Sequence, residues 1–402
     1  MTFFLVPLYL LVIPYIGLML MVIVGMFRAQ RRPYTDATPS VSVVIPAHNE
    51  EDKLGSTLAS LSEQRYSGKV EFVIVNDRSV DATGAIIDRF VEQDPRFRRL
   101  DVTEPSRRFA PKVNAVDHGI QGSSGTIIIT SDADCIYPEG WIHGLVSHFE
   151  PDVAMVIGHV ETTQPGDEVG PVQRFEAIDW LSLMLTARSL THFGWKFAST
   201  ANNQAYRRSA FEAIGGFGAG GRAPSGDEDV LTQRIGRLEG VRVVFASAPE
   251  TRVLTQPMPS LGAFLNQRRR WVSRYHHVVH YHPAFLASIG TLGFQSIMLS
   301  LAVLLTPFFP ALAPYVFGLW AVKLAVEFTG MYIGTGQLER RDMWGWQTVM
   351  WALLHPFFIA TISIWSFIKS GEWKAGAQSY RRRFFKRQWR EWRRKVKSSL
   401  VR

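Results

Sequence analysis

Two aspartates one residue apart, Asp132 and Asp134, have the spacing that points most directly to chemistry. They follow an apolar run over residues 126–130, which reads as a buried strand between turn signals. Carboxylates this close repel each other, so one of them resists ionisation unless a cation is present. Mg²⁺ or Mn²⁺ is usually held by one or two carboxylates together with substrate phosphates. The pair therefore predicts either a divalent-cation site or a solvated turn. The positions of the other polar residues along the chain distinguish between these two interpretations.

Further polar side chains follow other predicted strands. The β-rich run at 41–46 leads into Ala47 and Glu50, and the run at 70–75 ends in Asp77. Strands alternating with helices predict βαβ units and a mostly parallel sheet, with ligands bound at the carboxyl ends of the strands. We therefore expect Glu50, Asp77 and the aspartate pair in one crevice, as a nucleotide-plus-metal site. No Gly-x-Gly-x-x-Gly follows a predicted strand, and no Gly-Lys-Ser/Thr loop is present, so dinucleotide and P-loop sites are unsupported.

Three consecutive acids, Asp227, Glu228 and Asp229, precede a helical pattern set by Leu231 and Ile235. Acids at a helix start cap it and favour its dipole, which is the structural interpretation. The functional interpretation is a general base that takes a proton from an acceptor hydroxyl. The helix register makes Asp227 the cap and Glu228 the base, with Asp229 as the alternative.

A basic and aromatic run, Gln267-Arg268-Arg269-Arg270-Trp271, precedes the last apolar segments. Arginine suits bidentate contacts to phosphate, and tryptophan suits stacking on a sugar or base. The alternative is an interfacial helix with its charges at lipid headgroups.

Apolar sequence is concentrated at the two ends of the 402-residue chain. Residues 1–27 read as a retained transmembrane helix followed by arginines, which places that end in the cytoplasm. Three more apolar runs cover 284–306, 311–333 and 346–368. We divide the chain into a 1–27 helix, a 40–250 catalytic domain, 251–282 interfacial helices, 283–370 membrane segments and a 371–402 basic tail. Because three full spans would place that tail outside, one segment is expected to be re-entrant, interfacial or hairpin-like. The last segment, which contains His355 and Pro356, is the candidate.

The net charge of +9 lies largely in the tail and after the first span. Beside membrane segments, such a charge favours anionic lipid headgroups over nucleic acid. On the middle apolar run, Lys323 and Glu327 are four residues apart and are expected to pair inside a helix bundle. The single cysteine, Cys135, excludes an internal disulfide and fits a reducing cytosol.

The ordered motifs resemble those of the family 2 glycosyltransferases, above all membrane-embedded members such as hyaluronan, cellulose and poly-N-acetylglucosamine synthases and ceramide glucosyltransferase. The resemblance covers roughly residues 40–275 and rests on Pro46–Glu50, Asn76-Asp77, Lys112, Asp132–Asp134, Gly226–Asp229 and Gln267–Trp271. It implies a GT-A fold, which is Rossmann-like and mostly parallel, and inverting transfer from a nucleotide-diphosphate sugar, expected to be a UDP-sugar.

The resemblance also implies roles for individual residues. Ala47 would contact the nucleotide-sugar donor, and Glu50 and Asp77 would contact its nucleoside part. Lys112 and Asp132 would hold the nucleotide and diphosphate, and Asp134, with Asp132, the Mg²⁺ or Mn²⁺ ion. Gln267, Arg270 and Trp271 would bind the diphosphate and close over the acceptor site. The general base in this family is usually an aspartate, which favours Asp229. Alignment of the family motif without gaps instead places Glu228 at the position of the base.

The expected enzyme is a multi-pass protein of the inner or plasma membrane with a cytoplasmic catalytic domain. The few spans favour a lipid acceptor, with a processive polysaccharide synthase acting on a saccharide as the alternative. A non-catalytic nucleotide-sugar-binding protein is the third hypothesis. Nucleic acid is not an expected partner.

Overall fold

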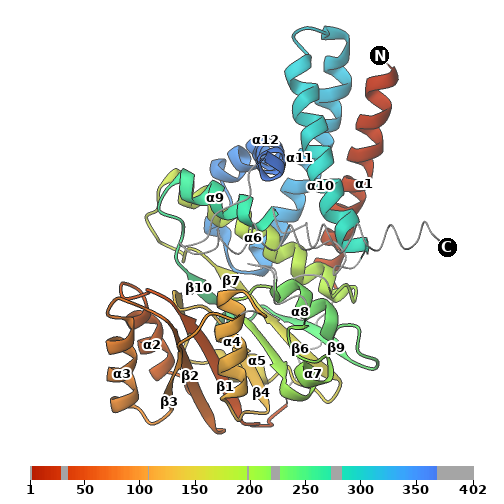
Figure 1. Ribbon diagram of the computed structural model, residues 1–402. Coiled ribbons are helices and arrows are strands. Elements are labelled where there is room, and N and C mark those ends of the chain that lie inside the picture. Colours follow the sequence, from red (N-terminus) through yellow and green to blue (C-terminus); the bar gives the residue numbers. More distant parts are fainter. Residues whose placement is uncertain are drawn as a thin grey trace, which may run out of the picture.

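The computed structural model describes residues 2–28, 35–106, 108–196, 199–218, 227–272 and 283–368. Figure 1 shows an α/β domain at one end of the molecule and long helices that project away from it at the other. The projecting helices are α1, α10 and α11, with α12 lower down beside the domain. Their bounds are α1 (Thr2–Met26), α10 (Pro283–Leu305), α11 (Ala313–Gln337) and α12 (Trp346–Ile368).

The domain is built on a seven-stranded sheet of β1 (Val41–Ala47), β2 (Val70–Asp77), β3 (Phe97–Val102), β4 (Ile127–Thr130), β6 (Val153–Gly158), β8 (Gln204–Arg207) and β9 (Arg242–Ala246). The strand order is β3-β2-β1-β4-β8-β6-β9. All neighbouring pairs are parallel except those of β8, which is antiparallel to both β4 and β6. Consecutive residues of β4 and β6 are all buried, as expected for a sheet covered on both faces. The predicted mostly parallel α/β fold is confirmed.

Short helices connect and cover the strands: α2 (Leu54–Ser62), α3 (Thr83–Gln93), α4 (Pro111–Gln121), α5 (Trp141–Val146), α7 (Arg208–Ala213) and α8 (Asp227–Ile235). Helix α4 begins with Pro111, whose fixed φ suits the first turn. A Cβ added at Gly119 would lie 2.4 Å from Cγ1 of Val44, so α4 is seated directly on the sheet. Because a helix that follows a parallel strand starts at the carboxyl edge of the sheet, the first turn of α4 brings Lys112 there.

A second, three-stranded sheet of β5 (Cys135–Ile136), β10 (Val253–Thr255) and β7 (Val160–Glu161) lies beside the first, in that order. The sequence predicted one strand over 153–160, but the chain changes sheets at His159. The backbone N–H of His159 donates to Ala246 O at 3.0 Å, and its carbonyl accepts from Val253 N at 3.0 Å. One apolar run therefore supplies β6 to the large sheet and β7 to the small one.

Helix α6 (Pro171–His192) joins the domain to the projecting helices. A Cβ added at Gly25 of α1 would lie 2.8 Å from Cβ of Ser189, and one added at Gly334 of α11 would lie 2.3 Å from Cδ1 of Leu185. The two glycines therefore let α1 and α11 rest on α6 at close range. These two close contacts, together with those of α12 with α6 and α9, position the apolar helices against the α/β domain.

Three helices of the described chain are long and apolar enough to cross a membrane: Pro283–Leu305, Pro310–Gln337 and Trp346–Ser366, and a shorter apolar helix covers Val12–Met26. Inside the bundle, Lys323 Nζ donates to Glu327 Oε1 at 2.6 Å, and the Tyr15 hydroxyl donates to the same oxygen. Both partners of the Lys323–Glu327 pair are buried, which confirms the pairing expected from their spacing. The re-entrant or interfacial course expected for the last apolar segment stays a prediction.

Two segments differ from the sequence-based division. Residues 253–255 form β10, so the segment 251–282 is not purely helical; its described helix is α9 (Leu261–Val272). Strand β8 was not predicted, because Gln204–Arg207 alternates too little to stand out from the polar residues before it. The short 3-10 helices are η2 (Pro249–Thr251), η4 (Pro310–Leu312) and η5 (Arg341–Met343). The basic tail and the arginines at 31 and 32 lie outside the described residues.

Candidate active site

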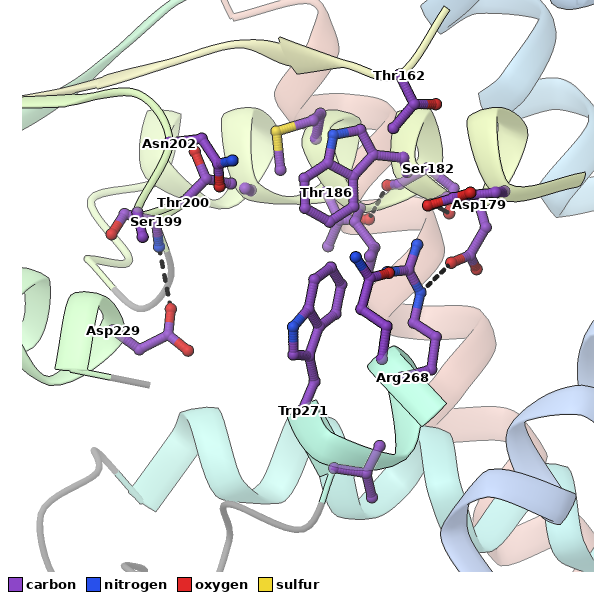
Figure 2. A pocket seen from close by; sticks show the side chains of 18 of the residues that line it. Thr162, Asp179, Ser182, Thr186, Ser199, Thr200, Asn202, Asp229, Arg268 and Trp271 are labelled. Carbon is purple, nitrogen blue, oxygen red and sulfur yellow. Dashed lines mark hydrogen bonds and ion pairs between the residues drawn. The ribbon is translucent and has the colours of Figure 1, made fainter. Parts of the chain in front are cut away.

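A cavity of about 830 Å³ opens where β1, β2 and β4 end, and continues between the apolar helices α1, α10, α11 and α12. Its domain end is lined by the carboxylates expected to act on the donor. Its far end is lined mainly by apolar side chains of α1, α10, α11 and α12, including Leu18, Leu292 and Ile359, with the polar side chains of Tyr15 and Glu327 among them. Figure 2 looks into the middle of this cavity, where α6 and α9 face each other. One continuous space therefore connects the sheet edge to the bundle interior.

The turns after β1 and β2 are tied to each other at the mouth of the cavity. Asn49 and Arg78 have φ of 52° and 57°, in the left-handed region that asparagine tolerates better than most residues. Asn49 Oδ1 accepts from Val80 N at 2.9 Å, and Nδ1 of His48 lies 2.6 Å from Asp77 O. These bonds fix the backbone that carries the cavity-lining residues Ala47, Glu50 and Asp77.

Each member of the aspartate pair faces a lysine. Asp132 pairs with Lys112 of α4, and Asp134 Oδ2 lies 3.6 Å from Lys53 Nζ. Burial raises the pKa of Asp134, and the charge of Asp132 raises it further. The turn between them is anchored by Thr57, whose hydroxyl donates to Ala133 O at 2.8 Å. The aspartates are thus held close together, each opposite one lysine, with Glu50 as a further negative charge near Asp134.

The carboxylate oxygens of Asp132 and Asp134 are suitable ligands for a hard divalent cation. Two carboxylates converge at Asp132 and Asp134, and the pKa of Asp134 is raised first by burial and then by the charges of Asp132 and Glu50, which a bound cation would offset. In the described part of the chain no cluster of three or more His, Cys, Asp or Glu side chains could complete a protein-only cage. Mg²⁺ and Mn²⁺ are suited to such a partial site, because waters and substrate phosphates supply their remaining ligands.

The acids of α8 reach the same cavity. Glu228 and Asp229 both line it, and Glu228 is the more buried of the two, with 9% of its surface exposed. Asp229 Oδ1 accepts from Ser199 N at 3.1 Å, which orients its carboxylate (Figure 2). The backbone carbonyl of Glu228 accepts from the hydroxyls of Ser199 and Thr232. Both base candidates are therefore in place, and the side chain of Asp227 lies outside the described part.

Helix α9 brings Gln267, Arg270 and Trp271 to the cavity. Arg268, which follows Gln267 on the same helix, has a buried acidic partner. Its Nε donates to Asp179 Oδ2 of α6 at 2.8 Å (Figure 2). The Arg268 guanidinium lies 4.1 Å from the centre of the Trp271 ring. A buried ion pair between α6 and α9 thus sets the position of Trp271.

All the predicted site residues with described side chains line this one cavity: Ala47, Glu50, Asp77, Lys112, Asp132, Asp134, Glu228, Asp229, Gln267, Arg270 and Trp271. Sequence reasoning missed Lys53 and Asp179, and it named Arg268 only as part of the run Gln267–Trp271, without its partner Asp179. The signal for Asp179 was an acid beside Trp180 in an otherwise apolar stretch of α6. For Lys53 no pattern in the sequence gave a signal.

Comparison with known proteins agrees with this geometry. The model of glycosyl transferase family 2 matches residues 42–215. A probable glycosyltransferase of Bacillus subtilis (strain 168) is 29% identical over 245 residues, which cover 60% of this chain and 56% of that protein. Poly-beta-1,6-N-acetyl-D-glucosamine synthase of Staphylococcus aureus (strain MSSA476) is 24% identical over 251 residues, 61% of this chain and 56% of that protein. The matched part spans little more than half the length of these relatives.

Among solved structures, a mannosyltransferase from Pyrobaculum calidifontis in complex with GDP-Man and Mn²⁺ superposes with a TM-score of 0.57 at 18% identity. The superposition covers 90% of this chain and 99% of that one, and at this identity it speaks for the fold alone. The order of parallel strands, the acids at their carboxyl ends and the family match over 42–215 agree with one another. Residues 42–215 therefore form a family 2 glycosyltransferase domain, and the α/β domain has the GT-A fold.

Proposed function

We propose that this protein transfers a sugar, with inversion, from a nucleotide-diphosphate sugar to a hydroxyl of a membrane lipid. The observation that carries the proposal is the cavity of about 830 Å³ that runs from the sheet-edge carboxylates into the membrane helices. A donor entering from the sheet edge and a lipid entering from the bundle meet in it. In this proposal the domain faces the cytoplasm and the helices cross the plasma membrane.

The donor would lie across the carboxyl ends of β1, β2 and β4. Glu50 and Asp77 would contact the nucleoside, and Lys112 and Arg270 the diphosphate. Asp134, with Asp132, would hold a divalent cation, as the Mn²⁺ in the mannosyltransferase complex also supports. Such a cation, when bound, offsets the charge that develops on the departing diphosphate. A UDP-sugar is the expected donor, and GDP-sugars belong in the same test.

The acceptor hydroxyl needs a base on the side of the sugar opposite the leaving diphosphate. Glu228 and Asp229 both line the cavity, so either would take the proton as the new bond forms. Asp229 has the residue type of the family, and one of its oxygens is already oriented by Ser199 N. Glu228 has the more buried position. In this proposal the base is one of these two acids.

The apolar end of the cavity favours a lipid as acceptor, because side chains such as Leu292 and Ile359 offer nothing to the hydroxyls of a sugar chain. A processive polysaccharide synthase is the second candidate, favoured by the similarity to the poly-N-acetylglucosamine synthase. The two differ in product: a single sugar on a lipid, or a polymer that grows with time.

The test is nucleoside diphosphate release by the purified full chain in lipid vesicles, with a panel of UDP- and GDP-sugars and with Mg²⁺ or Mn²⁺. The wild-type protein is expected to turn over at least one donor. Asp134→Ala is expected to remove that turnover, whereas Asp52→Asn, an exposed acid outside the cavity, should leave it unchanged. Full activity of Asp134→Ala would remove the cation from the mechanism, and no release with any donor would reject the enzyme.

A further inference from the structure

The turn between α11 and α12 is inserted into the α/β domain. Arg340, in this turn, is 2% exposed, and its Nη1 donates to Thr163 O at 2.8 Å. The same guanidinium pairs with Glu161 of β7. Its Nε donates to Asp342 Oδ1 at 2.9 Å, which closes the turn around it. Helix α12 therefore begins on the side of the bundle that faces the domain.

The last turns of α12 contact the same side of the bundle. The Arg269 guanidinium of α9 lies 4.3 Å from the centre of the Trp365 ring. Further back along α12, the Phe358 ring stacks on Phe264 of α9, with ring centres 5.1 Å apart. Helix α9 is joined to α6 by the buried ion pair described above, beside the domain (Figure 1). Both ends of α12 are therefore fixed on the domain side.

The middle of α12 contacts a part of the bundle that lies away from the domain. The Phe357 ring is 5.9 Å from the Trp320 ring of α11, measured between centres. Trp320 packs against an apolar cluster that includes Leu312 of η4, in the turn that joins α10 to α11. The neighbouring Pro356 has no N–H for the helical hydrogen bond, so the helix can bend at this point. These contacts indicate a helix that enters the bundle, reaches inward at its middle and returns.

The outward face of α12 is apolar, whereas its inward face is partly polar. Met350, Leu354 and Ile364 are 42%, 46% and 49% exposed, and no Asp, Glu, Lys or Arg occurs in the helix. His355 and Ser363, by contrast, are buried. An uncharged face with exposed large apolar side chains is suited to acyl chains and not to water.

The length of α12 alone would allow it to cross a membrane. Its 23 residues span about 35 Å, and a hydrocarbon core is about 30 Å thick. A helix that crosses carries its last residues to the side opposite its first. The contact of Trp365 with Arg269 instead places the last turns beside α9. Helices α10 and α11 differ in this respect, because they are joined through η4 at the end of the bundle remote from the domain (Figure 1).

We propose that α12 is a re-entrant helix, which enters the leaflet on the domain side and returns to that side without crossing the membrane. Its outward face contacts acyl chains of that leaflet. Its opposite face, with Trp351, His355 and Phe358, lines the cavity. Helix α12 is then a wall between the cavity and the lipid. This inference refines the membrane part of the proposed function and does not depend on sugar transfer.

The charge distribution of the sequence agrees with this course. Crossings by α1, α10 and α11 alone place the Lys- and Arg-rich residues 371–402 on the same side as Arg28. Basic segments beside membrane helices are favoured on the cytoplasmic side. A fourth crossing, by α12, would place these two basic segments on opposite sides of the membrane.

The test is labelling of single cysteines by a membrane-impermeant maleimide, in intact cells that express the full chain and in opened membranes. The only native cysteine, Cys135, is 0% exposed, so the wild-type protein gives the background. Asp52→Cys reports on the domain, Phe308→Cys on the turn between α10 and α11, and Arg341→Cys on the turn before α12. A cysteine appended to Arg402 reports on the chain after α12. The three substitutions replace exposed side chains, so the fold should be kept.

In intact cells, Phe308→Cys is expected to be labelled, whereas Asp52→Cys, Arg341→Cys and the appended cysteine should lose labelling. All four should be labelled once the membranes are opened. Arg341→Cys and the appended cysteine found on opposite sides would overturn the proposal, because α12 would then cross. Phe308→Cys found on the same side as Asp52→Cys would also overturn it, since α10 and α11 would then not cross.

The labelling assay contains no sugar donor, so its result is independent of the proposed function. A crossing α12 in a protein that glycosylates lipid would reject the re-entrant helix and keep the transferase. The expected labelling in a protein that turns over no donor would keep the re-entrant helix and reject the transferase.

Discussion

The ion pair between Asp179 and Arg268 is predicted to hold α6 and α9 together around Trp271. Its Nε–Oδ2 distance is 2.8 Å, and the two side chains are 4% and 6% exposed. Removing one partner of a buried pair typically costs about 3–5 kcal/mol, because the other charge is left without compensation. At about 2–4 °C per kcal/mol, Asp179→Leu should lower the apparent melting midpoint by at least roughly 6 °C. Arg268→Met should lower it by a similar amount.

The double variant Asp179→Leu with Arg268→Met separates pairing from packing. It leaves two apolar side chains and no buried charge, so its midpoint should lie above those of both single variants. The measurement is a thermal scan in detergent, together with the acceptor KM, which should rise in the single variants because Trp271 loses its support. Glu139→Gln is the control, since its 2.8 Å pair with Arg65 is exposed and contributes little. Single variants within 2 °C of the wild type, or strictly additive losses in the double variant, would refute the reasoning.

Three other predictions concern the base, the helix contact and a buried acid. Glu228→Gln and Asp229→Asn each remove one candidate base. The variant that loses the true base should have a kcat lower by about 10²–10⁴-fold, and the other variant should lose much less, as measured by single-turnover kinetics. Gly334→Val should separate α11 from α6, because an added Cβ would lie 2.3 Å from Leu185 Cδ1. The variant should have a lower melting midpoint and a lower rate of sugar transfer to the acceptor. An unchanged transfer rate would contradict a role of this helix contact in acceptor use. Burial alone would raise the pKa of Glu71, but hydrogen bonds led by Ser124 N–H lower it from 4.5 to about 2. Because this folded-state pKa is depressed, Glu71→Gln should cost stability above pH 4.5, and the difference should vanish as the pH falls through about 2; a pH-independent difference in urea unfolding would contradict this.

The parts of the fold that depend on local pattern could be predicted from the sequence. Strands β1, β2 and β4 are continuous apolar runs ended by polar residues, and parallel topology then places Glu50, Asp77 and Asp134 at one edge. The pairing of Lys323 with Glu327 followed from helical spacing alone.

What could not be predicted depends on contacts between distant segments. Lys53 meets Asp134 because α2 starts at the same edge, and Asp179 meets Arg268 across 89 positions of sequence. The change of sheet at His159 needs β10, which comes almost a hundred residues later. Spacing within one element carries no information about such partners. The base was also left undecided, because the register of α8 and the residue type of the family favour different acids.

The most direct test of the account is mass spectrometry of the lipid extract after the full chain in vesicles has been incubated with a turned-over donor and a divalent cation. The account predicts a lipid that carries one added sugar, absent with Asp134→Ala and present with Asp52→Asn. A water-soluble polymer whose length grows with time, with no glycosylated lipid in the extract, would contradict it.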